Sequence, residues 1–334
     1  MIHALPVLRL LKLHFPRSEI HWWLASSLVP MLEGDPDLSG IFPFERGHHA
    51  SLRRWPEIIR SVRVLRAQRF DWVIDLQGLA RSGLFAWLAN GDFCLGLDND
   101  REGRREGAQL FYDRLAPRSA PATHAVERYL SVLPALGVLV HQRFEWLPVR
   151  PDVAARVREK WPTDDARWVV LLPGARWDNK RWPVEYFAAL PRLLAPSWPD
   201  ARFAILGSRE DSGLARVIQE ANPARCLDLT GQTSLPEMIE WIRRSHLVIT
   251  NDTGPMHVAA ALRKPTLAVF GPTDPDLTGP YGQRERVLHA AGLACVPCLK
   301  SRCAHATPLA CLHALAPENV AAAARALLDG PTVA

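Results

Sequence analysis

Residues 250–274 read TNDTGPMHVAAALRKPTLAVFGPTD, and this stretch indicates how the second half of the chain folds. The apolar and β-branched run 247–250 predicts a short buried strand, and a helix is expected at 254–262. A second strand is predicted at 266–270. The loops that follow the two strands then point out of one sheet edge, where open α/β sheets bind nucleotides.

The start of this helix has the features of a phosphate site. Asp252 and Thr253 are good N-cap residues, and the first amides of a helix lie unpaired at the positive end of its dipole. Gly254 lets the backbone approach a ligand closely, and His257 lies one turn further along the same face. The same pattern also fits an ordinary α/β turn with a capping aspartate.

A second strand–loop–helix pattern lies upstream, where residues 168–183 read WVVLLPGARWDNKRWP. A hydrophobic strand runs into a Pro-Gly-Ala turn and a polar loop that contains Arg176 and Lys180. A lysine in such a loop can hold a diphosphate as a point charge, although a solvated lysine is the simpler alternative. Two such patterns in one half of the chain suggest a sugar-nucleotide pocket.

These motifs resemble the bacterial ADP-heptose:lipopolysaccharide heptosyltransferases, glycosyltransferase family 9. The segments PGA…KRWP, NDTGPMH and FGPTDP occur in the family's order, and so do DLQGLARSG at 75–83 and HAVERYL at 124–130. The resemblance covers nearly the whole chain. It implies an α/β fold of GT-B architecture, in which two Rossmann-like doubly wound domains face a cleft. The nucleotide-sugar binds mainly to the second domain and the acceptor to the first.

Length and periodicity agree with two domains, since 334 residues can form two α/β domains with separate cores. The Pro- and charge-rich stretch 138–166 predicts the junction, so we expect an acceptor domain at 1–150 and a nucleotide-sugar domain at 151–334. A helix is predicted at 106–115. The Ala-rich helix at 318–328 is expected to return to the first domain, as terminal helices do in GT-B enzymes.

The resemblance assigns donor-site roles residue by residue. Lys180 resembles the lysine that contacts the diphosphate. Asp211 resembles an acidic residue that receives ribose hydroxyls, and a helix N-cap is an equally good interpretation. The full set of donor-site candidates is Ala175, Arg176, Lys180, Asp211, Asp252, Thr253, Gly254 and His257.

The resemblance also implies inverting transfer from ADP-heptose, with no cofactor and no metal. A carboxylate would take the acceptor's proton, and Lys180 with helix N-termini would stabilise the leaving diphosphate. The acceptor is lipid A–Kdo or the heptosylated core. Acceptor-side candidates are Asp75, Gln77, Arg81, Arg53 and Arg54. Two alternatives stay open: a GT-B protein that binds without turnover, and a UDP-sugar 2-epimerase of the same fold, which nucleotide preference would distinguish.

The family begins with a strand and a Gly-Asp turn whose aspartate is the presumed base, and a segment like IHALP follows them. This sequence begins at that segment, with Met1 directly before it. We therefore expect the true start to lie upstream of Met1. Asp75 is the next candidate for the base.

Positive charge gathers at Arg46, Arg53, Arg54, Arg60, Arg63, Arg66 and Arg69. This cluster predicts docking to an anionic membrane, because each juxtamembrane cation adds about 1 kcal/mol of attraction; a solvated helix face is the alternative. Nucleic acid is not an expected partner, since no binding module is recognisable. Neither a signal-peptide pattern nor an 18-residue apolar run occurs, so we expect a cytoplasmic protein on the inner face of the inner membrane.

Six cysteines fall into two groups. Cys94 and Cys226 lie in predicted strands and are expected to be buried and inert. The other four form a C-x2-C-x4-C-x7-C pattern, which resembles a structural zinc or Fe–S site without having a standard zinc-ribbon spacing. We expect reduced structural thiols and no metal at Cys295, Cys298, Cys303 and Cys311.

Overall fold

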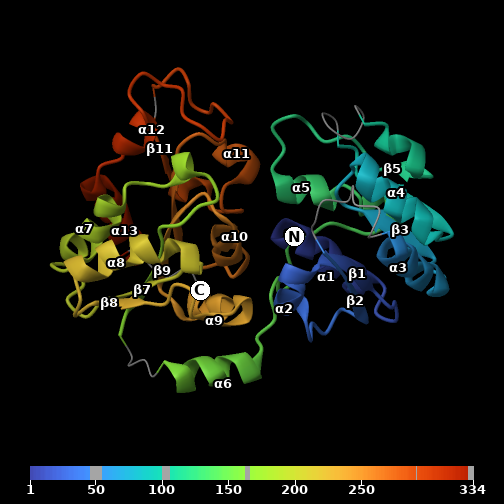
Figure 1. The fold of residues 1–334 in the computed structure, drawn as a ribbon, viewed down its shortest axis with the longest axis horizontal. Coiled ribbons are helices and arrows are strands. Elements are labelled where there is room, and N and C mark those ends of the chain that lie inside the picture. The colour runs from blue at the N-terminus through green and yellow to red at the C-terminus, as the bar shows by residue number, and fades with distance from the viewer. Residues whose placement is uncertain (46–54, 100–105, 162–165, 291, 330–334) are drawn as a thin grey trace. The chain divides into compact units, whose positions relative to one another are not determined.

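The structure is a computed structural model that describes residues 1–45, 55–99, 106–161, 166–290 and 292–329. The chain forms two compact units (Figure 1). Residues 3–146 and Met1 form the first, and residues 147–334 and Ile2 form the second. The division lies inside the predicted junction stretch, just before the predicted boundary at residue 150.

The second unit is built on a parallel sheet. Among the described residues its strand order is β11-β10-β9-β6-β7-β8. The strands are β6 (Trp168–Leu172), β7 (Arg202–Ile205), β8 (Cys226–Asp228), β9 (Leu247–Asn251), β10 (Thr266–Phe270) and β11 (Val287–His289). Every residue of β6, β9 and β10 is buried, as expected for parallel strands covered on both faces. The expected α/β fold is confirmed, and β11 is a strand that the sequence pattern did not predict.

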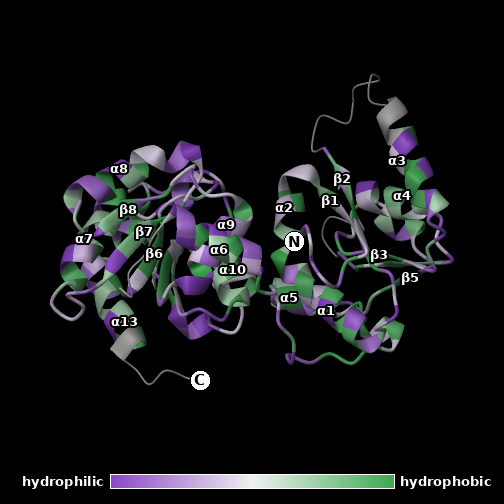
Figure 2. Ribbon diagram, turned by 90° about the horizontal axis from the view of Figure 1, so that it is seen from below, coloured by the Kyte–Doolittle hydropathy of each residue, from purple (hydrophilic) through white to green (hydrophobic). Residues whose placement is uncertain are grey.

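Helices alternate with these strands, and the strands of the sheet are drawn largely in the hydrophobic colour (Figure 2). Ser234 and Glu237 form a capping box at the start of α9, which fixes where that helix begins. The helices of this unit are α6 (Pro151–Lys160), α7 (Val184–Leu194), α8 (Ser212–Ala221), α9 (Leu235–Arg244), α10 (Gly254–Ala261), α11 (Pro275–Thr278), α12 (Ala310–His313) and α13 (Pro317–Asp329).

The last helix, α13, packs inside the second unit. Val320, Ala321 and Ala324 are fully buried in the same cluster as Phe187 and Leu190 of α7. The narrow apolar stripe at positions i, i+1 and i+4 has small residues that let α13 lie close against α7. The return of this helix to the first domain stays a prediction.

The first unit contains two parallel sheets among its described residues. Strands β1 (His21–Ala25) and β2 (Gly40–Phe44) form one, and β3 (Trp72–Asp75), β4 (Phe93–Gly96) and β5 (Arg114–Leu115) form the other. No described strand pairs with both β1 and β3, so the single sheet expected for this domain is replaced by two. Its helices are α1 (Leu5–His14), α2 (Val29–Leu32), α3 (Trp55–Ala67), α4 (Ala80–Ala89) and α5 (Ala125–Leu130).

The helix predicted at 106–115 is wrong. Residues 108–111 form one 3-10 turn, and β5 follows it. Asp113 explains the difference, because its carboxylate accepts a hydrogen bond from the Cys94 amide at 2.7 Å and its own amide donates to the Cys94 carbonyl at 2.9 Å. These contacts with β4 hold the segment extended, and long-range pairing overrides local helix propensity.

A helix that the sequence analysis missed lies in the predicted junction. Helix α6 begins with Pro151 and buries Val153, Ala154 and Val157 along one face. This face packs against α9. The charge-rich composition of the stretch concealed the apolar stripe, since only three positions of the helix are buried.

Candidate functional site

The strand order of the second unit reverses between β6 and β9. These two strands are neighbours, with Val170 opposite Val248 and Leu172 opposite Thr250. From β6 the chain proceeds outward through β7 and β8, and from β9 it proceeds outward on the other side through β10 and β11. The loops after β6 and β9 therefore leave the sheet at its topological switch point, where doubly wound sheets bind ligands.

Asn251 ties these two loops together. Its Nδ2 donates to the Pro173 carbonyl at 2.7 Å, and its Oδ1 accepts from the Trp182 amide at 3.0 Å. Asn251 is fully buried, so these bonds replace all of its contact with water. Asn251 was not singled out from the sequence. A carboxamide at the end of the otherwise apolar and β-branched strand β9 was the signal that could have identified it.

Asp252 brings three loops to one point. The Lys180 ammonium lies 2.6 Å from Asp252 Oδ2, and the Thr273 hydroxyl donates to the same oxygen at 2.6 Å. Lys180 comes from the loop after β6, Asp252 from the loop after β9, and Thr273 from the loop after β10. Two separately predicted residues thus meet, and Thr273 joins them as a residue that was not singled out from the sequence.

The Lys180 ammonium is held but not enclosed. It also stands 4.7 Å from the centroid of the Trp177 ring, and its side chain keeps 17% of its exposure. An ammonium has three N–H donors, and the bond to Asp252 uses one. The remaining donors can serve an anionic group that enters at the sheet edge.

The start of α10 is open. Thr253 occupies the N-cap position, and its side chain makes no capping hydrogen bond. A methyl group placed on Gly254 would meet no atom within 4 Å. His257 is half-buried one turn further along the helix. The positive end of the helix dipole therefore faces free space next to Lys180 and Asp252.

Asp211 lies on the other side of the loop after β6. Its Oδ2 accepts hydrogen bonds from the Ser208 amide and hydroxyl, both at 2.8 Å, and completes a capping box in which Ser208 is the N-cap. Asp211 stands at the N-cap position of α8, but its side chain makes no capping hydrogen bond to that helix. Its carboxylate also lies against Gly174, where a Cβ atom would overlap it. Asp211 thus connects the turn at Ser208 with the Pro-Gly-Ala turn. Arg176 is exposed in that turn.

Ala175 is buried in the same turn, and its carbonyl accepts from Arg181 Nε at 3.0 Å. Arg181 also pairs with Asp178 at 3.0 Å. It therefore shapes the loop that carries Lys180, and sequence reasoning did not give it this role.

The acceptor-side candidates belong to the first unit. Asp75 is buried at the end of β3, where its carboxylate accepts from the Tyr112 hydroxyl at 2.7 Å and from the Gln77 amide at 2.8 Å. Burial, with the charge of Asp75, raises the pKa of Tyr112. Both Asp75 oxygens are used internally, so this geometry argues against Asp75 as the base.

The other acceptor-side candidates differ in how they are placed. Gln77 and Arg81 are exposed. Arg53 and Arg54 lie outside the described residues, as does Arg46 of the basic cluster.

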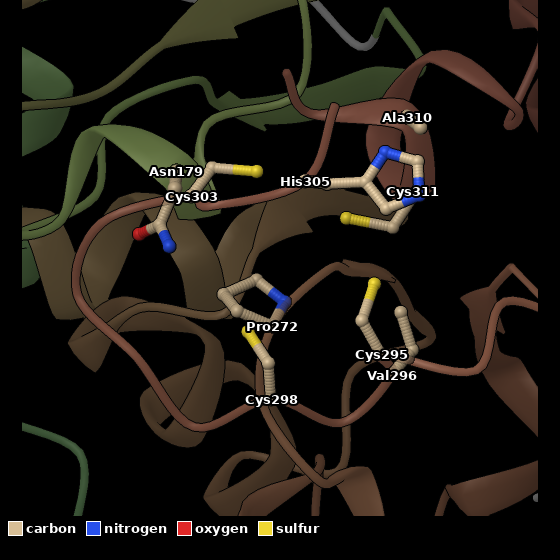
Figure 3. A pocket seen from close by; sticks show the side chains of 9 residues that line it. All are labelled: Asn179, Pro272, Cys295, Val296, Cys298, Cys303, His305, Ala310 and Cys311. Atoms are coloured by element: carbon tan, nitrogen blue, oxygen red, sulfur yellow. The ribbon is translucent and has the colours of Figure 1, made fainter. Parts of the chain in front are cut away.

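The six cysteines fall into a buried pair and a less buried group of four, as the sequence suggested. Cys94 and Cys226 are buried free thiols, and burial raises the pKa of each to about 12, so both are inert thiols. The other four are free and less buried. Together with His305 they line a pocket next to Asn179 and Pro272 (Figure 3).

The chain is similar in sequence and in fold to known heptosyltransferases. The family model for glycosyltransferase family 9 (heptosyltransferase) matches residues 58–307. Lipopolysaccharide heptosyltransferase 1 of Pseudomonas aeruginosa is 29% identical, over 99% of this chain and 95% of its own. The E. coli heptosyltransferase WaaC, solved with ADP, is 28% identical with a TM-score of 0.71, over 86% of this chain and 88% of its own. The E. coli ADP-heptose lps heptosyltransferase II shares the fold, with a TM-score of 0.76 at 23% identity over 98% of this chain and 95% of its own.

Proposed function

Because the chain belongs to glycosyltransferase family 9, we propose that it transfers heptose from ADP-heptose to the inner core of lipopolysaccharide, with inversion and without a metal at the diphosphate. The observation that carries this proposal is the meeting of Lys180, Asp252 and Thr273 at the switch point of the sheet. The solved relative WaaC was determined with ADP, which supports an adenine nucleotide donor.

The donor site supplies positive charge where the leaving group needs it. As the bond from the anomeric carbon to the diphosphate breaks, negative charge grows on the diphosphate oxygens. The Lys180 ammonium and the open start of α10 are aimed at one region and stabilise that charge. Asp252 holds Lys180 in place before the donor arrives, so little reorganisation is required during the reaction.

The proposal also covers the contact with the ribose of the donor and the attack by the acceptor. Asp211 lies against Gly174 with Oδ2 occupied by Ser208, and we assign the ribose hydroxyls to its other oxygen. The acceptor hydroxyl oxygen attacks the anomeric carbon, its proton passes to a carboxylate base, and ADP leaves with the bonding electron pair. Asp75 is disfavoured as that base, because it is buried and accepts hydrogen bonds from Tyr112 and Gln77.

We also propose that the first unit docks on an anionic membrane through α3 and α4. Arg60 and Arg63 are exposed on α3, and Leu84 and Trp87 are exposed on α4 beside Arg81. The two helices pack together, and Arg66 donates to Asn90 at 3.2 Å across them. Exposed apolar side chains among cations suit a membrane surface, which offers apolar depth and anionic headgroups. In the described part of the chain no helix is long and apolar enough to cross a membrane.

The test is a transfer assay with the purified chain, ADP-heptose and two acceptors, lipid A–Kdo and a singly heptosylated core. We expect one ADP released per heptose added, detected by mass spectrometry, with rates that are equal in excess Mg²⁺ and in EDTA. Anomeric analysis of the product by NMR reports inversion. The preferred acceptor identifies whether the first or the second heptose is added.

Two outcomes favour the alternatives. ADP binding without product from either acceptor would indicate a binding protein that does not turn over. Epimerisation of a UDP-sugar, without use of ADP-heptose, would replace the proposal by a 2-epimerase. A rate that requires Mg²⁺ would overturn the metal-independent step only.

A further inference from the structure

The segment between β11 and α13 concentrates thiols without burying them. None of the described residues from 292 to 311 is buried, and the stretch contains four of the six cysteines. Cysteine is among the most buried residue types in proteins, so four partly or fully exposed free thiols in one segment require an explanation. The proposed transfer reaction uses none of them.

These thiols are gathered around one space. Cys295, Cys298, Cys303 and Cys311 line the same pocket, and the His305 ring lies beside Cys311 (Figure 3). They come from different parts of the segment, so the fold brings together thiols that the sequence separates. Residues 292–311 contain no buried side chain, and among the four cysteines Cys311 is the one that packs against the core.

Four cysteine thiolates are soft ligands, and they favour thiophilic metal ions. Four cysteine thiolates form the tetrahedral sites that bind Zn²⁺ or iron, and a C-x2-C pair supplies two adjacent ligands. The Leu309 amide already donates to Cys303 Sγ at 3.4 Å, and such N–H donors support the charge of a thiolate ligand.

We propose that Cys295, Cys298, Cys303 and Cys311 bind one thiophilic divalent metal ion, for which Zn²⁺ is the probe. Across the described residues no three His, Cys, Asp or Glu side chains stand in ligating positions as the structure has them. Binding therefore requires side-chain rotation toward the centre of the pocket. The side chains of Cys295 and Cys303 are exposed and can turn toward Cys311, which stays packed against the core.

The cysteine-containing segment is hydrogen-bonded to two of the donor-site loops. Asn179 Nδ2 donates to the Lys300 carbonyl at 2.8 Å, and the Leu299 amide donates to the Pro272 carbonyl at 2.8 Å. Asn179 and Pro272 are the immediate neighbours of Lys180 and Thr273. A bound ion would thus fix the segment that braces two donor-site loops, as a structural ion outside the reaction.

The experiment measures metal content, which does not depend on the proposed function. The chain is purified under reducing conditions, supplied with Zn²⁺, passed over a desalting column with EDTA, and analysed by plasma mass spectrometry. We expect about one zinc per chain, and a Co²⁺-substituted sample should show thiolate-to-cobalt charge transfer. Hydrogen exchange at 292–311 should slow in the zinc form.

Variants decide whether the cluster is responsible. Cys295→Ser with Cys298→Ser should abolish retained zinc, and Cys303→Ser alone should weaken it, which guards against misfolding of the double variant. Cys226→Ala is the matched control outside the pocket and should keep the stoichiometry. His305→Ala should also keep it if the four thiolates suffice.

Two results would overturn the proposal. One is a wild-type chain that retains no zinc or iron while all four thiols react freely with a thiol reagent. The other is unchanged metal content in the double cysteine variant. Loss of transfer activity with retained metal would speak against the proposed function and leave this site standing.

Discussion

At the residue scale, Lys180 is the side chain on which donor binding depends most. Its ammonium is the cation held at the switch point by Asp252. A ligand at a hundredfold excess over its Kd stabilises its protein by about 2.7 kcal/mol, so ADP should raise the Tm. We expect Lys180→Ala to remove most of that rise, measured by differential scanning fluorimetry.

Lys160→Ala is the matched control, since this exposed lysine of α6 donates to the Gln232 carbonyl and belongs to none of the three loops that meet at Asp252. Its own Tm can fall, but the rise caused by ADP should be unchanged. Equal ADP-induced shifts in Lys180→Ala and the wild type would remove Lys180 from the site.

In the first unit, Arg9 is the side chain whose loss we expect to reduce the free energy of unfolding most clearly. It is buried in α1, donates to Asp35 at 2.6 Å and to Asp37 at 2.7 Å, and reaches the Trp146 carbonyl at 3.1 Å. Arg9→Met would leave these carboxylates without their cation. Breaking a buried pair in this way costs about 3–5 kcal/mol, which urea unfolding can measure.

Arg17→Met, at an exposed position near the end of α1, should change the free energy of unfolding by less than about 0.5 kcal/mol. Adding Asp35→Asn to Arg9→Met should recover part of the loss, because it removes one uncompensated charge. A single variant Arg9→Met as stable as the wild type would show that the charges become solvated.

At the element scale, the capping box at the start of α9 predicts that Glu237 stabilises the fold in a pH-dependent way. Burial alone would raise the pKa of Glu237, but hydrogen bonds with Ser234 and the charge of Lys160 outweigh it, and the pKa is lowered from 4.5. A lowered pKa in an acid means that its stabilisation is present above the unfolded value and is lost as the pH falls through the folded one. Glu237→Gln should therefore lower Tm above about pH 5.

The difference in Tm between Glu237→Gln and the wild type should close only as the pH falls through the folded pKa of Glu237, which lies below 4.5, because both side chains are then neutral. Val217→Ala, at an exposed position of α8, changes no charge and is the control that should show no such pH-dependent difference. A constant difference from pH 3 to pH 7 would show that packing, rather than charge, distinguishes the two side chains.

At the scale of the whole molecule, the surface of α3 and α4 predicts membrane affinity. Sedimentation with vesicles should recover more protein on anionic than on neutral lipid, and salt should weaken this because the Debye length is about 10 Å at 0.1 M. Arg60→Gln with Arg63→Gln should reduce binding mainly at low salt. Trp87→Ala should reduce it at every salt concentration, because the ring contributes apolar area.

Leu139→Ala is the control for the apolar term, since Leu139 is 79% exposed elsewhere in the first unit. It should leave vesicle binding unchanged. Equal partitioning onto neutral and anionic vesicles would mean that the arginines are only a solvated helix face.

The sequence by itself determined the family, the alternating α/β pattern and most elements of the second unit. The strands 168–172 and 266–270 are nearly continuous apolar runs, and the helix predicted at 254–262 begins at Gly254 after its N-cap residue Thr253. Information of this kind is local, because burial and capping are written in neighbouring residues. The family prediction is confirmed by the match over 58–307.

Only the tertiary structure decided which residues meet. Lys180, Asp252 and Thr273 are far apart in the chain and touch because parallel strands deliver their loops to one edge. The same is true of α13, whose small apolar stripe matches α7, and of residues 114–115, which pair with β4 as a strand. These outcomes depend on partners distant in sequence, and local propensity cannot specify a partner.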